Sequence, residues 1–498
     1  MTPFYDTKAI CDAFELTPEQ ITEYPASFVA LPQGRLMMCK LKDEKKIIAK
    51  GEGGLFSELD GILISDSVRV CPLSHENRLA LNQFLPYTKP VSFGSGVPTF
   101  GTGDRLGLAT PAHIRSVRRY GVKPILAQQS KRELELTGRN YTQVLDDVCF
   151  AVFQEGYQGG FGADGNHLKY AEDVRDALAL GYTMITLDCS EKMGKAAELL
   201  SNDELLPLYQ NLSVDYRTRI EKAYLGKKFD VAKSEYAFTA DELRRCALVY
   251  HGVVDFAGEI YRNVLSAANH AVDFELSVDE TASVTTPHAH IFIATELLHQ
   301  NVRITSLAPR FVGEFQKGID YRGDVAGFEA QLAEHAAIAS HFGHKLSVHS
   351  GSDKFGIFPI IGKYASGNLH LKTSGTSWLE AVAVVAERNP ALYRRIHEKA
   401  LACFEKALRF YHVTADPDKI AGLESVKDDE LIRYLENDDS RQLLHITYGF
   451  ILDDHALKRE LYETLELYEA FYMERLISHM DRHLVQIWKE DDHGRSFT

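Results

Sequence analysis

The sequence predicts a (β/α)₈ barrel with a small N-terminal α+β region and a helical C-terminal extension. Short extended runs alternate with helical stretches from about residue 90 onward, which is typical of βα units around a parallel sheet. Several of these helical stretches end in Gly or Asn, the residues that favour a helix C-terminus. The extended runs number eight, and eight βα repeats favour a closed barrel over an open doubly wound sheet.

Each expected strand is a short, mainly apolar run that ends in polar or glycine-rich residues. Helical stretches such as TPAHIRSVRRYG and AEDVRDALALG lie between the runs. With the polar residues at their ends, the eight runs are 100–107, 123–130, 159–167, 182–190, 273–281, 302–311, 344–352 and 368–376.

The flanking segments differ in pattern from the barrel repeats. Residues 1–88 are mixed in charge and punctuated by Gly, which indicates a small α+β region. The catalytic barrel is expected over 89–412, with an insertion at about 191–236 in the long gap between the fourth and fifth strands. Strand signals stop after residue 412, and alternating charges on amphipathic stretches predict helices within 413–498.

Composition narrows the class of protein. The 498 residues are 45% hydrophobic and 25% charged, which excludes a disordered or low-complexity chain. The net charge of −15 disfavours binding to nucleic acid or to an anionic membrane, and no long apolar run predicts a membrane span. Seven scattered cysteines without a CxxC pair, and an N-terminus without an apolar signal region, predict free thiols in the cytoplasm. We therefore expect a small-molecule partner, and the sequence leaves a homo-oligomer open.

Polar residues collect at the ends of the expected strands, where barrel enzymes carry their reacting groups. Side chains alternate along a strand, so Leu346 and Val348 should face the helices while His349 faces the barrel interior. The same rule turns Asp188 and Asp279 inward. The strand-end residues are Asp104, Arg105, Gln128, Gln129, Asp164, His167, Asp188, Asp279, Glu280, Arg310, Glu314, His349, Ser350, Asp353, Lys354 and Lys372.

Two histidines and several carboxylates at one barrel mouth suit a divalent ion such as Zn²⁺, Mn²⁺, Co²⁺ or Ni²⁺. We expect His167 and His349 to bind it together with Asp279, Glu280 or both. Any single strand-end histidine is more often structural, and no HExxH-type signature is present, so the prediction depends on the whole set. His288, His290, His341 and His344 lie in or beside helical stretches and are interpreted as solvated or capping residues.

The remaining strand-end groups are candidates for substrate binding and acid/base chemistry. Cationic side chains could supply a local positive field for an anionic or polyol substrate, although each is individually more often a structural ion-pair partner. The stretch GTGDRLG lacks the spacing of a phosphate-binding loop and indicates a strand-to-helix turn. The substrate-binding candidates are Asp104, Arg105, Gln128, Gln129, Arg310, Glu314, Ser350, Asp353, Lys354 and Lys372.

Many ordered blocks of the sequence resemble the tagaturonate epimerase family, some members of which are described as tagatose 4-epimerases. FGADGNH departs from the FGADADH associated with that family but keeps Asp164 and His167. The resemblance implies a metal-dependent enzyme of hexuronate breakdown that interconverts D-tagaturonate and D-fructuronate. The blocks are FGTGDRLG, TPAH, AQQS, VLDD, VFQEGY, FGADGNH, GYTMITLD, SVDET, APRFVGEFQKGIDYRGD, HSGSDKF, KTSGTSWLEA and HITYG.

The implied reaction inverts a carbon β to a ketone, whose C–H bond the carbonyl does not acidify. Because no dinucleotide-binding fingerprint follows any strand, we favour retro-aldol cleavage and re-addition over transient oxidation. Asp164 is the expected acid/base, with Asp188 as second candidate. Arg310 and Lys354 are expected to hold the substrate carboxylate.

Two alternatives remain open. A weaker likeness to class II aldolases, where a zinc-binding histidine precedes a Gly/Ser-rich turn much as His349 precedes SGS, allows an aldolase that releases its fragments. A sugar-acid-binding protein without turnover is the other. Product analysis separates these alternatives from an epimerase.

Overall fold

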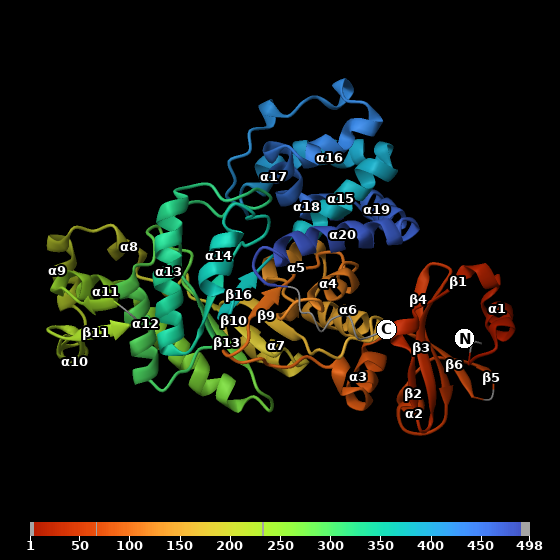
Figure 1. Ribbon diagram of the computed structural model, residues 1–498, viewed down its shortest axis with the longest axis horizontal. Helices are drawn as coiled ribbons and strands as arrows, with labels where there is room; N and C mark the ends of the chain where they lie inside the picture. The colour runs from red at the N-terminus through yellow and green to blue at the C-terminus, as the bar shows by residue number, and fades with distance from the viewer. Residues whose placement is uncertain (1–3, 66, 232–233, 490–498) are drawn as a thin grey trace.

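The computed structural model describes residues 4–65, 67–231 and 234–489. At the N-terminus an antiparallel sheet lies to one side of the rest of the molecule (Figure 1). Its strands follow the order β1-β3-β4-β6-β5, with β2 paired to β3. The elements are α1 (Thr7–Phe14), β1 (Ile21–Glu23), β2 (Val29–Leu31), β3 (Gly34–Leu41), β4 (Glu44–Gly51), α2 (Leu55–Glu58), β5 (Ile62–Ser65), β6 (Val68–Pro72) and α3 (His75–Phe84).

Eight parallel strands form a closed barrel, and the predicted fold class is confirmed. The strand order around the barrel is β10-β13-β14-β15-β16-β7-β8-β9. Each strand lies within one of the eight runs expected from the sequence, except that β7 begins one residue before its run and β9 ends one residue after its run. The strands are β7 (Thr99–Gly101), β8 (Lys123–Ala127), β9 (Gly162–Leu168), β10 (Met184–Asp188), β13 (Asp273–Ser277), β14 (Ser306–Ala308), β15 (Lys345–Val348) and β16 (Leu369–Lys372).

Helices surround the barrel (Figure 1). Gly138, Gly181 and Gly343 end three of them in the left-handed conformation, as the C-cap signals predict. The helices are α4 (Thr110–Val117), α5 (Lys131–Thr137), α6 (Tyr141–Gln154), α7 (Ala171–Leu180), α12 (Pro287–His299), α13 (Val325–Phe342), α14 (Phe358–Ala365) and α15 (Thr376–Arg388).

Between β10 and β13 the chain forms additional helices and a two-stranded sheet, with α11 packed against α12. These elements are α8 (Lys195–Glu198), α9 (Asn202–Gln210), α10 (Val214–Tyr224), β11 (Lys228–Val231), β12 (Ser234–Ala237) and α11 (Ala240–Asn263). Short 3₁₀ helices elsewhere cover 18–20, 25–27, 86–88, 265–267, 417–419, 423–425 and 428–435.

The C-terminal helices share a hydrophobic core with α15, to which Trp378, Leu443 and Leu476 contribute. Helix α20 packs against α4 and α15, and so attaches the end of the chain to the barrel. The C-terminal helices are α16 (Pro390–Ala407), α17 (Asp438–Ile446), α18 (Tyr448–Leu452), α19 (His455–Leu467) and α20 (Glu469–Leu484).

Side chains alternate along the barrel strands as predicted. Leu346 and Val348 of β15 join the core beneath the helices, whereas Lys345 points into the barrel and donates to Thr99 Oγ1 at 3.2 Å. The barrel interior therefore holds buried polar and charged side chains, such as Lys345 and Glu275. All seven cysteines are buried and unpaired. Among the described residues no helix is long and apolar enough to cross a membrane.

Three buried histidines form a hydrogen-bonded chain between α12, α13 and β15, so the interpretation of His290 and His344 as solvated or capping is wrong. The carbonyl of Thr285 can only accept, so His335 Nε2 donates to it at 3.0 Å. His290 Nδ1 then donates to His335 Nδ1, and His344 Nε2 donates to His290 Nε2, each at 2.9 Å. One proton per ring satisfies this chain, so all three imidazoles are neutral.

We expect this chain to make the protein less stable as the pH falls below about 6.5. Burial lowers the pKa of His335 to about 4 and that of His344 to about 3. The unfolded chain therefore binds protons that the folded state does not bind, and each such histidine lowers the free energy of unfolding by about 1.6 kcal/mol between pH 6.5 and 5. Urea unfolding at both pH values should show a smaller loss in His344→Gln than in the wild type, with His299→Gln, on the exposed end of α12, as control. Equal losses in all three proteins would contradict the prediction.

Candidate functional site

A cavity of about 420 Å³ lies at the carboxyl ends of the barrel strands. Loops after β8, β9, β13, β14, β15 and β16 contribute to its lining, together with the last residue of β10 and Tyr411. Eight of the residues singled out in the sequence line it: Gln128, His167, Asp188, Asp279, Glu280, His349, Ser350 and Lys372.

His349 lies between two carboxylates on the wall of this cavity. Its Nε2 is 2.8 Å from Glu275 Oε1, and its Nδ1 is 3.2 Å from Asp279 Oδ2. Burial disfavours the charged imidazole, but Asp279 and Glu275 outweigh it and raise the pKa of His349 to about 9. The geometry at Nδ1 does not make a hydrogen bond, so this buried nitrogen has no hydrogen-bond partner.

His167, Asp188 and Glu280 bring one donor atom each to within 4.8 Å of one another, which makes them a group able to hold a metal ion. His167 Nδ1 is 3.8 Å from Asp188 Oδ2, and the ring of His167 meets that of His349 with centroids 5.1 Å apart. His167 and Ser350 both adopt positive φ angles, of 55° and 51°. Such conformations are uncommon for residues with a Cβ, and they cluster at functional sites.

The floor of the cavity is an ion-pair network around Lys372. Its Nζ is 2.7 Å from Glu275 Oε1 and 2.9 Å from Asp164 Oδ2, and it donates to Asn166 Oδ1 at 2.8 Å. Thr186 Oγ1 also receives a bond from it. Burial alone would lower the pKa of Lys372, but the two carboxylates raise it above its ordinary value. Lys372 is therefore a charged ammonium that faces the cavity above two buried carboxylates.

Glu275 was not among the residues expected from the sequence, although the alternation of side chains along a strand points to it. Glu275 lies four residues before Asp279 on the same run, so the alternation that turns Asp279 inward turns Glu275 inward too. It is wholly buried, and His349, Lys372 and Ser306 all bond to it. The carboxylates Asp164 and Glu275 thus lie beneath the cavity, and neither lines it.

Other predicted substrate-binding residues lie outside the cavity lining. Asp104 accepts bonds from the backbone N–H groups of Leu106, Gly107, Ala109 and Thr110 and so shapes the turn into α4. Arg105 is buried against Glu133 at 3.0 Å, with its guanidinium 3.6 Å from the centre of the Tyr448 ring. Gln129 Oε1 accepts from the backbone N–H of Gln128.

The cations expected to clamp a carboxylate are also turned away from the cavity. Arg310 Nη1 donates to the carbonyl of Thr281 at 2.6 Å. Lys354 Nζ donates to three backbone carbonyls at 2.6–2.9 Å. Glu314 is exposed, and Asp353 is buried with His479 and His483, outside the cavity lining.

Four other cations line the cavity: Lys131, Arg132, Lys169 and Lys317. Lys317 donates to Ser374 Oγ at 2.9 Å, and burial lowers its pKa to about 8 against the opposing effect of Glu133. Lys131 and Lys169 pair with acidic residues near the rim. Lys131, Lys169 and Lys317 follow β8, β9 and β14 in the sequence, so the expectation that functional residues follow strand ends could also have identified them.

A polar, charge-lined cavity at the carboxyl ends of eight parallel strands is the arrangement of a barrel enzyme that acts on a small polar substrate. The family model described as tagaturonate epimerase matches residues 24–487, and the chain belongs to this family. It is 44% identical over 415 residues to the tagaturonate/fructuronate epimerase of Thermotoga maritima, covering 83% of this chain and 85% of the relative. The glycerol-complexed crystal structure of the fructuronate-tagaturonate epimerase of Cohnella laeviribosi matches with 48% identity and a TM-score of 0.94, covering 97% of this chain and 99% of that one. The native crystal structure of the same protein gives a TM-score of 0.93.

Proposed function

We propose that this chain is a metal-dependent epimerase that interconverts D-tagaturonate and D-fructuronate in the cavity at the barrel mouth. The proposal rests on one observation: a single cavity of about 420 Å³ is lined by two histidines, two carboxylates and a lysine, namely His167, His349, Asp188, Glu280 and Lys372. Family membership supports the same reaction. Buried, unpaired cysteines favour a reducing compartment such as the cytoplasm, and neutral tagatose is proposed as a second substrate.

The side chains of the cavity fit a divalent ion. His167, Asp188 and Glu280 are the proposed ligands, with His349 and Asp279 beside them, and the free Nδ1 of His349 is a further donor. Imidazole and carboxylate ligands suit Zn²⁺, Mn²⁺, Co²⁺ or Ni²⁺. His349 Nδ1 would act as a donor only after losing its proton to solvent, since the ring is otherwise a protonated imidazolium. When bound, the ion would supply Lewis-acid polarisation of the substrate ketone.

The residues of the floor fit a retro-aldol route. The hydroxyl of the carbon to be inverted loses its proton, the bond to the carbon beside the ketone breaks, and the resulting aldehyde turns before that bond forms again. Lys372 Nζ faces the cavity as an ammonium, and it is proposed to take up the hydroxyl proton as it passes one of its own protons to Asp164 Oδ2, 2.9 Å away. Both transfers reverse when the carbon–carbon bond forms again, so Asp164, which the sequence suggested for this role, acts through Lys372.

Lys317 is the proposed partner of the substrate carboxylate, because it lines the cavity while Arg310 and Lys354 do not. Replacing it by Met should raise KM for tagaturonate about 10- to 100-fold and change KM for neutral tagatose far less. Only the uronate loses a charge-assisted bond of roughly 1.5–3 kcal/mol. Steady-state kinetics on both sugars measure this, with Arg310→Met as matched control. Equal losses on both sugars in Lys317→Met, or a uronate-specific loss in Arg310→Met, would move the carboxylate site elsewhere.

NMR of a tagaturonate incubation in D₂O with added metal tests the reaction itself. An epimerase forms a single six-carbon product, and the retro-aldol route leaves the hydrogen of the inverted carbon in place. Deuterium at that carbon would refute the retro-aldol route. Two smaller carbonyl compounds would instead indicate an aldolase, and binding without any turnover a sugar-acid-binding protein.

A further inference from the structure

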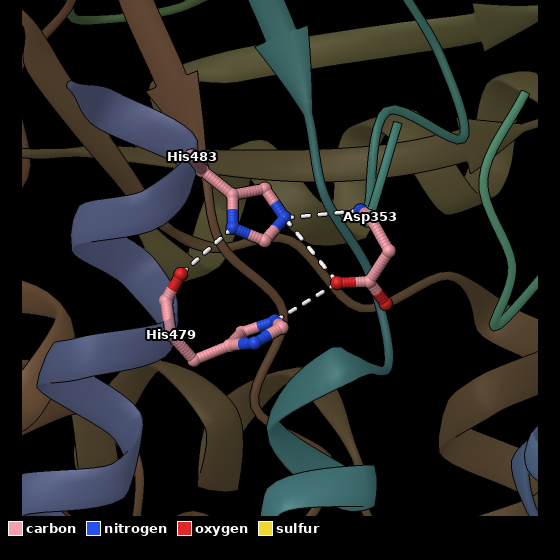
Figure 2. Close-up of side chains that lie close together, drawn as sticks. All are labelled: Asp353, His479 and His483. Carbon is pink, nitrogen blue, oxygen red and sulfur yellow. Dashed lines mark hydrogen bonds and ion pairs between the residues drawn. The ribbon is translucent and has the colours of Figure 1, made fainter. Parts of the chain in front are cut away.

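A second cluster of metal-binding side chains lies outside the cavity, where α20 packs beside the loop that follows β15. Figure 2 shows the imidazoles of His479 and His483 turned from α20 toward the carboxylate of Asp353. The two histidines are four residues apart and therefore share one face of the helix. All three side chains are buried.

The separations of the donor atoms match those around a small dication. Nε2 of His479 is 3.1 Å from Asp353 Oδ1, and Nε2 of His483 is 3.7 Å from the same oxygen. Donors bound at about 2.0–2.1 Å around a tetrahedral ion lie roughly 3.3 Å apart. The mean of the two observed separations is close to that value.

In each of the three side chains, the polar atom that points away from the cluster contacts another group of the protein. His479 Nδ1 faces Glu380 Oε1 at 3.4 Å, and His483 Nδ1 donates to the carbonyl of His479 at 2.9 Å. Arg441 Nη2 is 3.0 Å from Asp353 Oδ2. Metal-binding histidines characteristically donate their second nitrogen to a carboxylate or a backbone carbonyl, which orients the first toward the ion.

Two of the atoms that face one another inside the cluster lack a hydrogen-bond partner. Asp353 Oδ1 and His479 Nε2 are buried without a hydrogen bond. Because carboxylates lie close to both nitrogens of His479, the space between Nε2 and Asp353 favours a positive charge. That charge is either a proton on the ring or a metal ion. His483 Nε2 accepts the backbone N–H of Asp353 at 3.0 Å, and an ion would take over this lone pair.

We propose that Asp353, His479 and His483 bind a second divalent cation of the Zn²⁺ class, separate from the one proposed in the cavity. Three protein ligands leave one tetrahedral position for water. The ion would join the C-terminal helix to the loop that starts at His349 and Ser350, so its role is structural and the reacting carbons of the substrate do not touch it.

Zn²⁺ titration of chelator-treated protein by calorimetry tests this proposal, with Tm as a second readout. The Glu280→Gln variant weakens the cavity site alone, and it should still bind one equivalent of Zn²⁺ and gain several degrees in Tm. Asp353→Asn keeps the shape of the side chain, and it should lose one equivalent relative to the wild type. His397→Gln, which changes a buried histidine outside the cluster, is the matched control and should bind as the wild type does.

Unchanged Zn²⁺ stoichiometry in Asp353→Asn would overturn the proposal, as would the absence of Zn²⁺ binding in Glu280→Gln. Either result would assign the cluster to a metal-free ion pair between Asp353 and protonated His479. His483→Gln gives the same comparison if Asp353→Asn does not fold. Co²⁺ added to Glu280→Gln should produce the visible absorption of a tetrahedral site, and that absorption should be lost when His483→Gln is added.

Discussion

Replacing Lys372 by Met is expected to lower kcat by about 10²–10⁴-fold, the usual loss for one positioned acid or base. Lys372 is the ammonium on the cavity floor, 2.7 Å from Glu275 and 2.9 Å from Asp164. Its removal leaves buried carboxylates without their cation, so the unfolding free energy should also fall by about 3–5 kcal/mol. Steady-state kinetics and urea unfolding at 25 °C measure the two effects separately.

Two further variants separate chemistry from stability at this position. Adding Asp164→Asn to Lys372→Met removes one uncompensated carboxylate, which should restore stability without restoring kcat. Lys345→Met changes another buried lysine of the barrel interior that does not line the cavity, and it should reduce stability while kcat stays near the wild-type value. Recovery of kcat in the double variant would show that Lys372 acts only as a structural cation.

Replacing His167 by Gln is expected to abolish binding of the divalent ion proposed for the cavity and to lower kcat/KM by about 10³-fold. His167 supplies the only imidazole of the group it forms with Asp188 and Glu280. Losing a Lewis acid that contributes about 4 kcal/mol to the transition state corresponds to that factor. Metal analysis after dialysis and kinetics over a range of metal concentrations are the measurements. His349→Gln should show the same pair of losses if its Nδ1 is also a ligand.

The control for both variants is His251→Gln on α11, far along the chain from the barrel mouth. It should keep the metal content and kcat/KM of the wild type. Full metal occupancy in His167→Gln would exclude His167 as a ligand. Normal metal content with low activity in His349→Gln would instead make His349 a group that binds substrate or positions Glu275.

The barrel was predictable from the sequence because its signals are local. A strand such as β15 shows the alternation of apolar and polar residues within four positions. Helices such as α7 and α13 end at a glycine that can be read directly from the sequence. Eight such units in order leave few ways to pack, and the closed parallel barrel is the one observed. The alternation also placed Asp188, Asp279 and His349 on the side of the strand that faces the cavity.

The sequence by itself therefore determined the fold, the family and the face of each strand, whereas the tertiary structure decided which strand-end side chains reach the cavity. Strand alternation does not set the direction of a side chain that follows the last residue of a strand. Such a side chain contacts the groups that the folded loops place next to it. Lys354 is held by carbonyls of the loop near Gln316, and Arg105 by Glu133 and Tyr448. Asp353 meets two histidines of α20, more than a hundred residues later. These partners are distant along the chain, so no local pattern records them, and burial makes each pairing obligatory once the helices have packed.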